Sequence, residues 1–83
     1  MKQISDVVKF GDLFELYGKL LPPSQMQVAN MYFNEDLTIS EIAENLNVSR
    51  QAIFDSLKKS EKKLTLIENK VGALKIIKSL KKE

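Results

Sequence analysis

Apolar residues in the first 21 positions recur at intervals of three and four, which is the spacing of one face of an α-helix. This face consists of Phe10, Leu13, Phe14, Tyr17, Leu20 and Leu21. Pro22 and Pro23 follow directly. Because proline cannot continue a helix, we expect the first helix to end before them.

A second helix is predicted from Pro23 to about Phe33, since proline is well suited to the first turn of a helix. The side chains expected to face the core are Met26, Val28, Ala29, Tyr32 and Phe33. The polar residues 34–36 are too few for a flexible linker, so the next helix must fold back onto the first two. The pattern therefore predicts a compact helical cluster.

A third, short helix is predicted to begin after Thr38, because Thr38 and Glu41 have the spacing of a capping box. Its inward residues are Ile39, Ile42, Ala43 and Leu46. Ala43 is small, which favours a close crossing with another helix at that position. Asn47 tolerates the left-handed conformation and is expected to end the helix, and Val48 is expected to pack into the core.

Ser49 is a favourable N-cap for a fourth helix that begins at Arg50. Its predicted buried residues are Ala52, Ile53, Leu57 and Leu64. With Ile53 pointing inward and about 100° per residue, the opposite face carries Gln51, Asp55 and three lysines, with Arg50 and Phe54 at its edges. Glutamine and arginine can bridge base edges, and lysines suit phosphates. The candidate DNA-binding residues are therefore Ser49, Arg50, Gln51, Phe54, Asp55, Lys58, Lys59 and Lys62.

The pattern between Thr38 and Leu64 is typical of a helix-turn-helix. Two helices meet across a tight turn, a small inward residue precedes the turn, and a capped polar helix follows it. An ordinary helical hairpin with the same core positions is the alternative. We predict one all-α domain over residues 1–83, made of N-terminal helices (1–37), the helix-turn-helix (38–64) and a C-terminal helix or tail (65–83).

The C-terminal segment continues an apolar stripe through Ile67, Val71, Leu74 and Ile77. If the segment folds back, these side chains cover the first and fourth helices. If it projects, they form the seam of a homodimer, which would place two recognition helices about 34 Å apart. The spacing alone does not choose between these arrangements.

The composition excludes several classes of protein. Cysteine and histidine are absent, which removes disulfides, thiolate metal sites and the commonest general base and zinc ligand. No glycine-rich phosphate loop is present, so we predict no enzyme, no metal and no cofactor. Without a signal peptide, or the roughly 18 apolar residues of a membrane span, the expected location is cytoplasmic.

Charge is distributed unevenly along the chain. Residues 1–49 hold three lysines against seven acidic residues, a net charge of −4, and residues 50–83 hold ten basic against four acidic residues, a net charge of +6. A basic half suits a polyanion such as double-stranded DNA. A solvated lysine face on a surface helix explains the same count, so charge alone does not decide the partner.

The stretch from Leu20 to Leu64 resembles the region of bacterial sigma factors that recognises the promoter −35 element. More specifically, the chain resembles the YlxM family of small, sigma-like DNA-binding proteins. The features that carry this likeness are Phe14-Glu15-Leu16-Tyr17, Leu20-Leu21, Gln25-Met26 and the run Val48-Ser49-Arg50-Gln51-Ala52-Ile53-Phe54-Asp55.

This resemblance implies a bacterial protein with a role in transcription regulation. It also implies a link to the signal recognition particle pathway, because genes of the family lie beside genes of that particle. The leading hypothesis is therefore sequence-specific binding of double-stranded DNA. The alternative is an adaptor that uses the same surface for a protein or RNA partner in protein targeting, such as a component of the signal recognition particle, since a fold does not fix its ligand.

Overall fold

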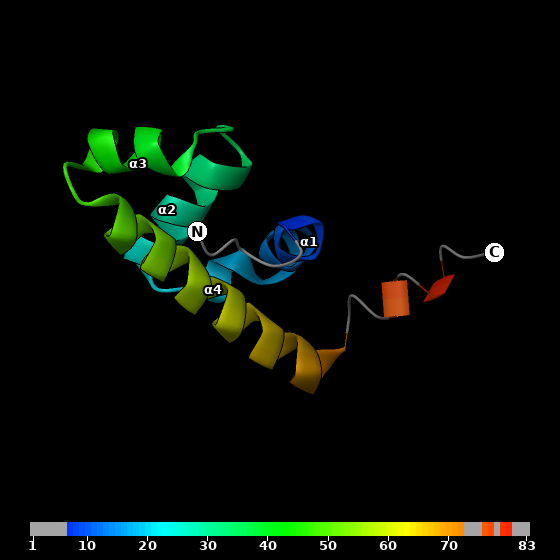
Figure 1. Cartoon of the computed structure of the whole chain (residues 1–83). Coiled ribbons are helices and arrows are strands. Elements are labelled where there is room, and N and C mark those ends of the chain that lie inside the picture. Colours follow the sequence, from blue (N-terminus) through cyan, green and yellow to red (C-terminus); the bar gives the residue numbers. More distant parts are fainter. Residues whose placement is uncertain (1–6, 73–75, 78, 81–83) are drawn as a thin grey trace.

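The computed structural model describes residues 7–72, 76–77 and 79–80. Along the chain, the elements are α1 (Val7–Tyr17), the 3-10 helix η1 (Gly18–Leu20), α2 (Pro23–Phe33), α3 (Ile39–Leu46) and α4 (Arg50–Val71). The described residues contain no strand, in agreement with the predicted all-α fold. Helix α4 is the longest, and α1, α2 and α3 all pack against it (Figure 1).

The first helix ends in a tighter turn than the apolar pattern predicts. Gly18 is buried there, and a Cβ atom at this position would lie 2.7 Å from the ring of Phe14. A 3-10 helix has three residues per turn instead of 3.6, so the tighter winding turns Leu20 away from the stripe. The prediction that Leu20 faces the core is therefore wrong, because its side chain is 60% exposed, whereas Leu21 is buried as expected.

Helix α2 begins at Pro23 and ends at Phe33, as predicted. Its buried face is centred on Val28 and includes Ala29. Met26 lies two residues before Val28, about 160° away around the helix, and it is 37% exposed. The prediction for Met26 is wrong for this reason. Phe33 is partly buried against α1, where its ring centroid lies 4.7 Å from that of Phe10.

The hydrophobic core draws on every helix. Its buried apolar members are Phe10, Leu13, Tyr17, Leu21, Val28, Ala29, Met31, Ile42, Ala43, Ile53, Leu57 and Leu64. Ser60 of α4 is the one buried polar side chain among the described residues. Its hydroxyl donates to the carbonyl oxygen of Ser56 at 2.9 Å and lies 3.4 Å from Oε1 of Gln25 in α2, so its burial leaves no polar atom without a partner.

Helix α4 continues through Leu64 to Val71, where Gly72 ends it in the left-handed conformation. The phenol of Tyr17 in α1 donates a hydrogen bond of 2.7 Å to Oε1 of Glu68, which ties the far end of α4 to α1. The long helix is therefore held against the cluster well beyond the predicted helix-turn-helix.

The C-terminal stripe is only partly packed. Ile67 lies against the core, Val71 is exposed and so does not cover α1, and Ile77 is partly buried. Leu74, another predicted member of the stripe, lies outside the described residues. Residues 76–77 and 79–80 lie beyond the end of α4, away from the other helices (Figure 1).

Candidate nucleic-acid interface

The turn between α3 and α4 is built by Asn47. Its φ of 56° and ψ of 47° are left-handed, as predicted. Two backbone hydrogen bonds close the end of α3: the Asn47 N–H donates to Glu44 at 3.2 Å, and the Val48 N–H donates to Ala43 at 3.0 Å. This pattern is a Schellman motif, which satisfies carbonyl groups at the helix end and reverses the chain sharply.

Side-chain caps fix where the two helices of the motif begin. In α3, the Thr38 hydroxyl accepts from the Glu41 N–H at 3.1 Å, and the Glu41 carboxylate accepts from the Thr38 N–H at 2.9 Å. In α4, the Ser49 hydroxyl accepts from the Ala52 N–H at 3.0 Å. Both predicted caps are confirmed, so the local sequence sets the length of the connection between α3 and α4.

The buried and exposed faces of α4 are separated cleanly. Ile53, Leu57, Ser60 and Leu64 alternate at spacings of four and three and face the core. The candidate residues that are exposed are Ser49, Arg50, Gln51, Asp55, Lys59 and Lys62, and those that are partly buried are Phe54 and Lys58. The fold therefore brings most of the candidate residues onto one accessible side of one helix.

Two pairs on this side of α4 interact within the free protein. The Gln51 amide nitrogen donates to Oδ1 of Asp55 at 2.8 Å. The Lys58 ammonium lies 3.6 Å from Oε1 of Glu61. To contact a base, Gln51 must therefore break or share its hydrogen bond to Asp55. The charge of Lys58 is partly compensated by Glu61. Arg50, Lys59 and Lys62 are thus the cations that the exposed face presents most openly.

Two side chains near the turn, Val48 and Ala52, differ from their predicted positions. Val48 is 47% exposed, because the left-handed residue before it directs the chain outward, so it does not fill the core. Ala52 is exposed because it lies about 100° from the buried stripe at Ile53. Phe54, expected at the edge of the exposed face, packs partly against the core, which reduces the apolar surface that it offers to a base.

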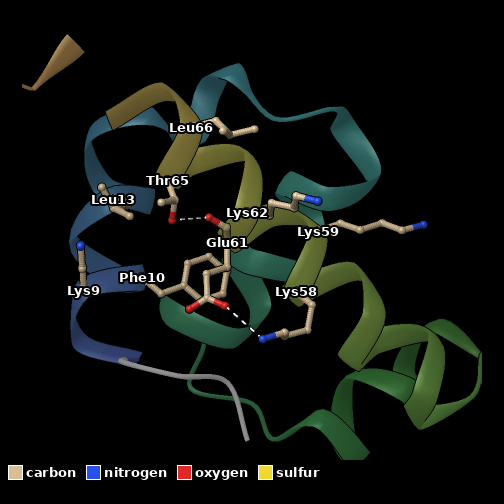
Figure 2. Close-up of a pocket in the computed structure, with 9 residues that line it drawn as sticks. All are labelled: Lys9, Phe10, Leu13, Lys58, Lys59, Glu61, Lys62, Thr65 and Leu66. Atoms are coloured by element: carbon tan, nitrogen blue, oxygen red, sulfur yellow. Dashed lines mark hydrogen bonds and ion pairs between the residues drawn. The ribbon is translucent and has the colours of Figure 1, made fainter. Parts of the chain in front are cut away.

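A groove between α1 and α4 brings together residues that the sequence pattern did not connect. This α1–α4 groove has a volume of about 630 Å³ (Figure 2). It is lined by Lys9, Phe10, Leu13, Lys58, Lys59, Glu61, Lys62, Thr65 and Leu66. Lys9 and Leu66 were absent from the predicted site. Only the packing of α1 on α4 places Lys9 in the same groove as lysines about 50 positions later in the chain.

Features of other classes of site are missing from the described part of the chain. Its residues contain no group of three or more acidic side chains arranged to hold a metal ion. None of its helices is both long enough and apolar enough to cross a membrane.

Comparison with known proteins finds bacterial relatives that carry the name UPF0122. The match to a protein of Lactococcus lactis subsp. cremoris (strain MG1363) is 39% identical over 69 residues, which cover 83% of this chain and 62% of that relative. The match to a protein of Desulforamulus reducens is 45% identical over 64 residues, which cover 77% of this chain and 55% of that relative. The match to a protein of Fusobacterium nucleatum is 38% identical over 80 residues, which cover 96% of this chain and 78% of that relative.

The chain thus spans less than two thirds of the length of the first two of these relatives. A family model, UPF0122, matches residues 4–83 and is described as "Putative helix-turn-helix protein, YlxM / p13 like". Because that match takes in nearly the whole chain and agrees with the α3–turn–α4 geometry, the chain belongs to this family of helix-turn-helix proteins.

Proposed function

We propose that this protein binds double-stranded DNA, with α4 in the major groove, and that it acts as a regulator of transcription. The observation that carries the proposal is the accessible side of α4, on which Gln51, next to the α3–α4 turn, and Lys59 and Lys62, further along the helix, are all exposed. In helix-turn-helix proteins the second helix enters the major groove and contacts base edges through its N-terminal residues.

The chemistry of this side of α4 divides into two parts along the helix. Near the N-terminus, Gln51 offers an amide that both donates and accepts, which matches the edge of adenine, and Asp55 offers a carboxylate that accepts from the amino group of cytosine. Two to three turns later, Lys59 and Lys62 are suited to phosphates, which position the protein without reading sequence. We therefore assign sequence reading to Gln51 and backbone attraction to the lysines.

The first experiment is selection from random duplexes at physiological salt, followed by two variants. Gln51→Ala is expected to weaken binding to the selected site by about 1–3 kcal/mol, which is the value of one bidentate base contact, while binding to unrelated duplex stays the same. Lys59→Ala is the matched control, and it is expected to weaken binding to both duplexes alike. If no preferred duplex emerges, or if Gln51→Ala changes neither affinity, the sequence-reading role is wrong.

The second experiment measures how binding depends on salt. Each lysine that neutralises a phosphate contributes about −0.9 to the slope of log K against log salt concentration. Replacing Lys58, Lys59 and Lys62 by alanine is expected to make the slope shallower, with the smallest change from Lys58 because it is already paired with Glu61. An unchanged slope in the triple variant would remove these lysines from the interface.

The adaptor hypothesis is the outcome that replaces DNA binding if both experiments fail. Its proposed partner is a component of the signal recognition particle, and that link, like the cytoplasmic location, stays a prediction. A homodimer through the C-terminal stripe also stays a prediction. Exposed Val71 leaves apolar surface on that stripe. A two-fold arrangement would have to present two copies of α4 about one turn of DNA apart.

A further inference from the structure

The α1–α4 groove combines an apolar floor with a basic rim. Phe10 and Leu13 of α1 lie at the floor, where each is only 1% exposed, and Leu66 of α4 stands at the rim with 54% of its surface exposed (Figure 2). The hydroxyl of Thr65 donates to the carbonyl oxygen of Glu61 at 2.8 Å, so the polar atom of Thr65 is already satisfied within α4. An apolar ligand group can therefore enter without leaving this hydroxyl unpaired.

The charge of the groove is strongly one-sided. Four lysines and one glutamate line it, which gives a net charge of +3. The glutamate, Glu61, has only 16% of its side chain exposed and lies 3.6 Å from the Lys58 ammonium. Lys59 and Lys62 extend away from the floor (Figure 2). A ligand that approaches the groove therefore meets positive charge around apolar surface.

DNA by itself matches only half of this surface. Its phosphates suit the lysines, but a phosphate backbone gains nothing from an exposed leucine beside them. An amphipathic helix satisfies both parts, because one face is apolar and acidic side chains flank it. The segment from Lys58 to Leu66 covers about 12 Å of helix at 1.5 Å per residue, which is enough for roughly two turns of a helical partner.

We propose that the α1–α4 groove binds an acidic, amphipathic helix of a partner protein. The apolar face of that helix lies on exposed Leu66, above the α1 floor, and its carboxylates pair with Lys59 and Lys62. The proposal does not depend on DNA binding, because Lys9 and Leu66 lie outside the DNA-reading part of α4. Since Lys59 and Lys62 belong to both surfaces, the partner and DNA exclude each other wherever both bind.

The test uses a defined probe and the full chain. The probe is a synthetic peptide of about 18 residues, long enough to form a helix, with leucines at positions i, i+3, i+4 and i+7 and glutamate at most others. The control peptide has the same composition in an order that breaks the stripe. Fluorescence anisotropy gives the affinities, and NMR chemical shifts locate the peptide on the protein.

We expect the striped peptide to shift the resonances of Lys9, Thr65 and Leu66 and to bind at least about tenfold more tightly than the control, because a buried leucine is worth more than 1.4 kcal/mol. Leu66→Ser should weaken binding by a similar factor. Leu20→Ser is the matched control variant, since Leu20 is also exposed but lies in η1, outside the groove.

Several results would overturn the proposal. Equal binding of the two peptides would show attraction by charge alone, and shifts located away from the groove would show another site. Absence of binding would exclude the acidic helix. If the groove resonances shift with protein concentration when no peptide is present, a second copy of the chain occupies the groove instead. By contrast, a loss of DNA affinity in Gln51→Ala with peptide affinity unchanged would support the proposal, because it would separate the peptide site from the DNA-reading residues.

Discussion

The substitution Ala43→Leu tests whether α3 and α4 depend on a small residue between them. Ala43 is 5% exposed and belongs to the core cluster. Its carbonyl oxygen also accepts the Val48 N–H at 3.0 Å, so the same residue takes part in the bond that closes α3. A leucine adds three carbon atoms at this point, and either the helices separate or the turn shifts.

The expected cost follows from packing. Extra methylene groups in a filled core typically cost about 1–3 kcal/mol, because neighbouring side chains leave their preferred rotamers. A domain of this size has a total stability of only about 4–12 kcal/mol, at roughly 0.05–0.15 kcal/mol per residue. Each kcal/mol lowers the melting temperature by about 4–8 °C in a domain of 60–100 residues. The variant should therefore melt about 4–24 °C below the parent protein.

Thermal unfolding followed by circular dichroism measures this difference, since domains of this length usually unfold in one cooperative transition. Glu44→Leu is the matched control: it places the same side chain one residue later, where the position is exposed, and it should change stability by no more than about 0.5 kcal/mol. If Ala43→Leu melts no lower than Glu44→Leu, the position is not a close crossing and the packing argument for the motif is incorrect.

Two further predictions concern single bonds and backbone conformation. Tyr17→Phe removes the 2.7 Å hydrogen bond to Glu68 and should lower the free energy of unfolding by about 1.5–3 kcal/mol, the range for bonds to charged groups; an unchanged urea midpoint would mean that this bond does not hold α1 to α4. Asn47→Val should cost at least about 1–2 kcal/mol, because a β-branched residue resists the left-handed conformation. Asn47→Gly is the control and should be no less stable than the parent protein in the same urea titration. Equal stability of the two variants would contradict the requirement for a left-handed residue at position 47.

Interactions between neighbouring residues explain which features of the fold could be predicted from the sequence alone. The capping box at Thr38, the left-handed Asn47 and the N-cap Ser49 each depend on residues within four positions. Such contacts are settled by the identity of neighbouring side chains, so the start of α3, the turn and the start of α4 could be predicted. The exposed face of α4 could also be predicted, because the period of about 3.6 residues per turn places Gln51 and Lys59 on the side opposite Ile53.

Contacts between segments that are distant in the sequence could not be predicted, because they depend on how the helices pack. Val48 and Met26 were expected in the core from their apolar character, but burial depends on which element packs opposite a side chain, and nothing covers these two fully. Ser60 shows the reverse case, since a polar residue is buried because Gln25 of α2 and the α4 backbone provide partners for its hydroxyl. The α1–α4 groove arises in the same way, because the docking of α1 on α4 brings Lys9 and Lys58 into one groove. A periodic pattern within one helix carries no information about how that helix packs on another.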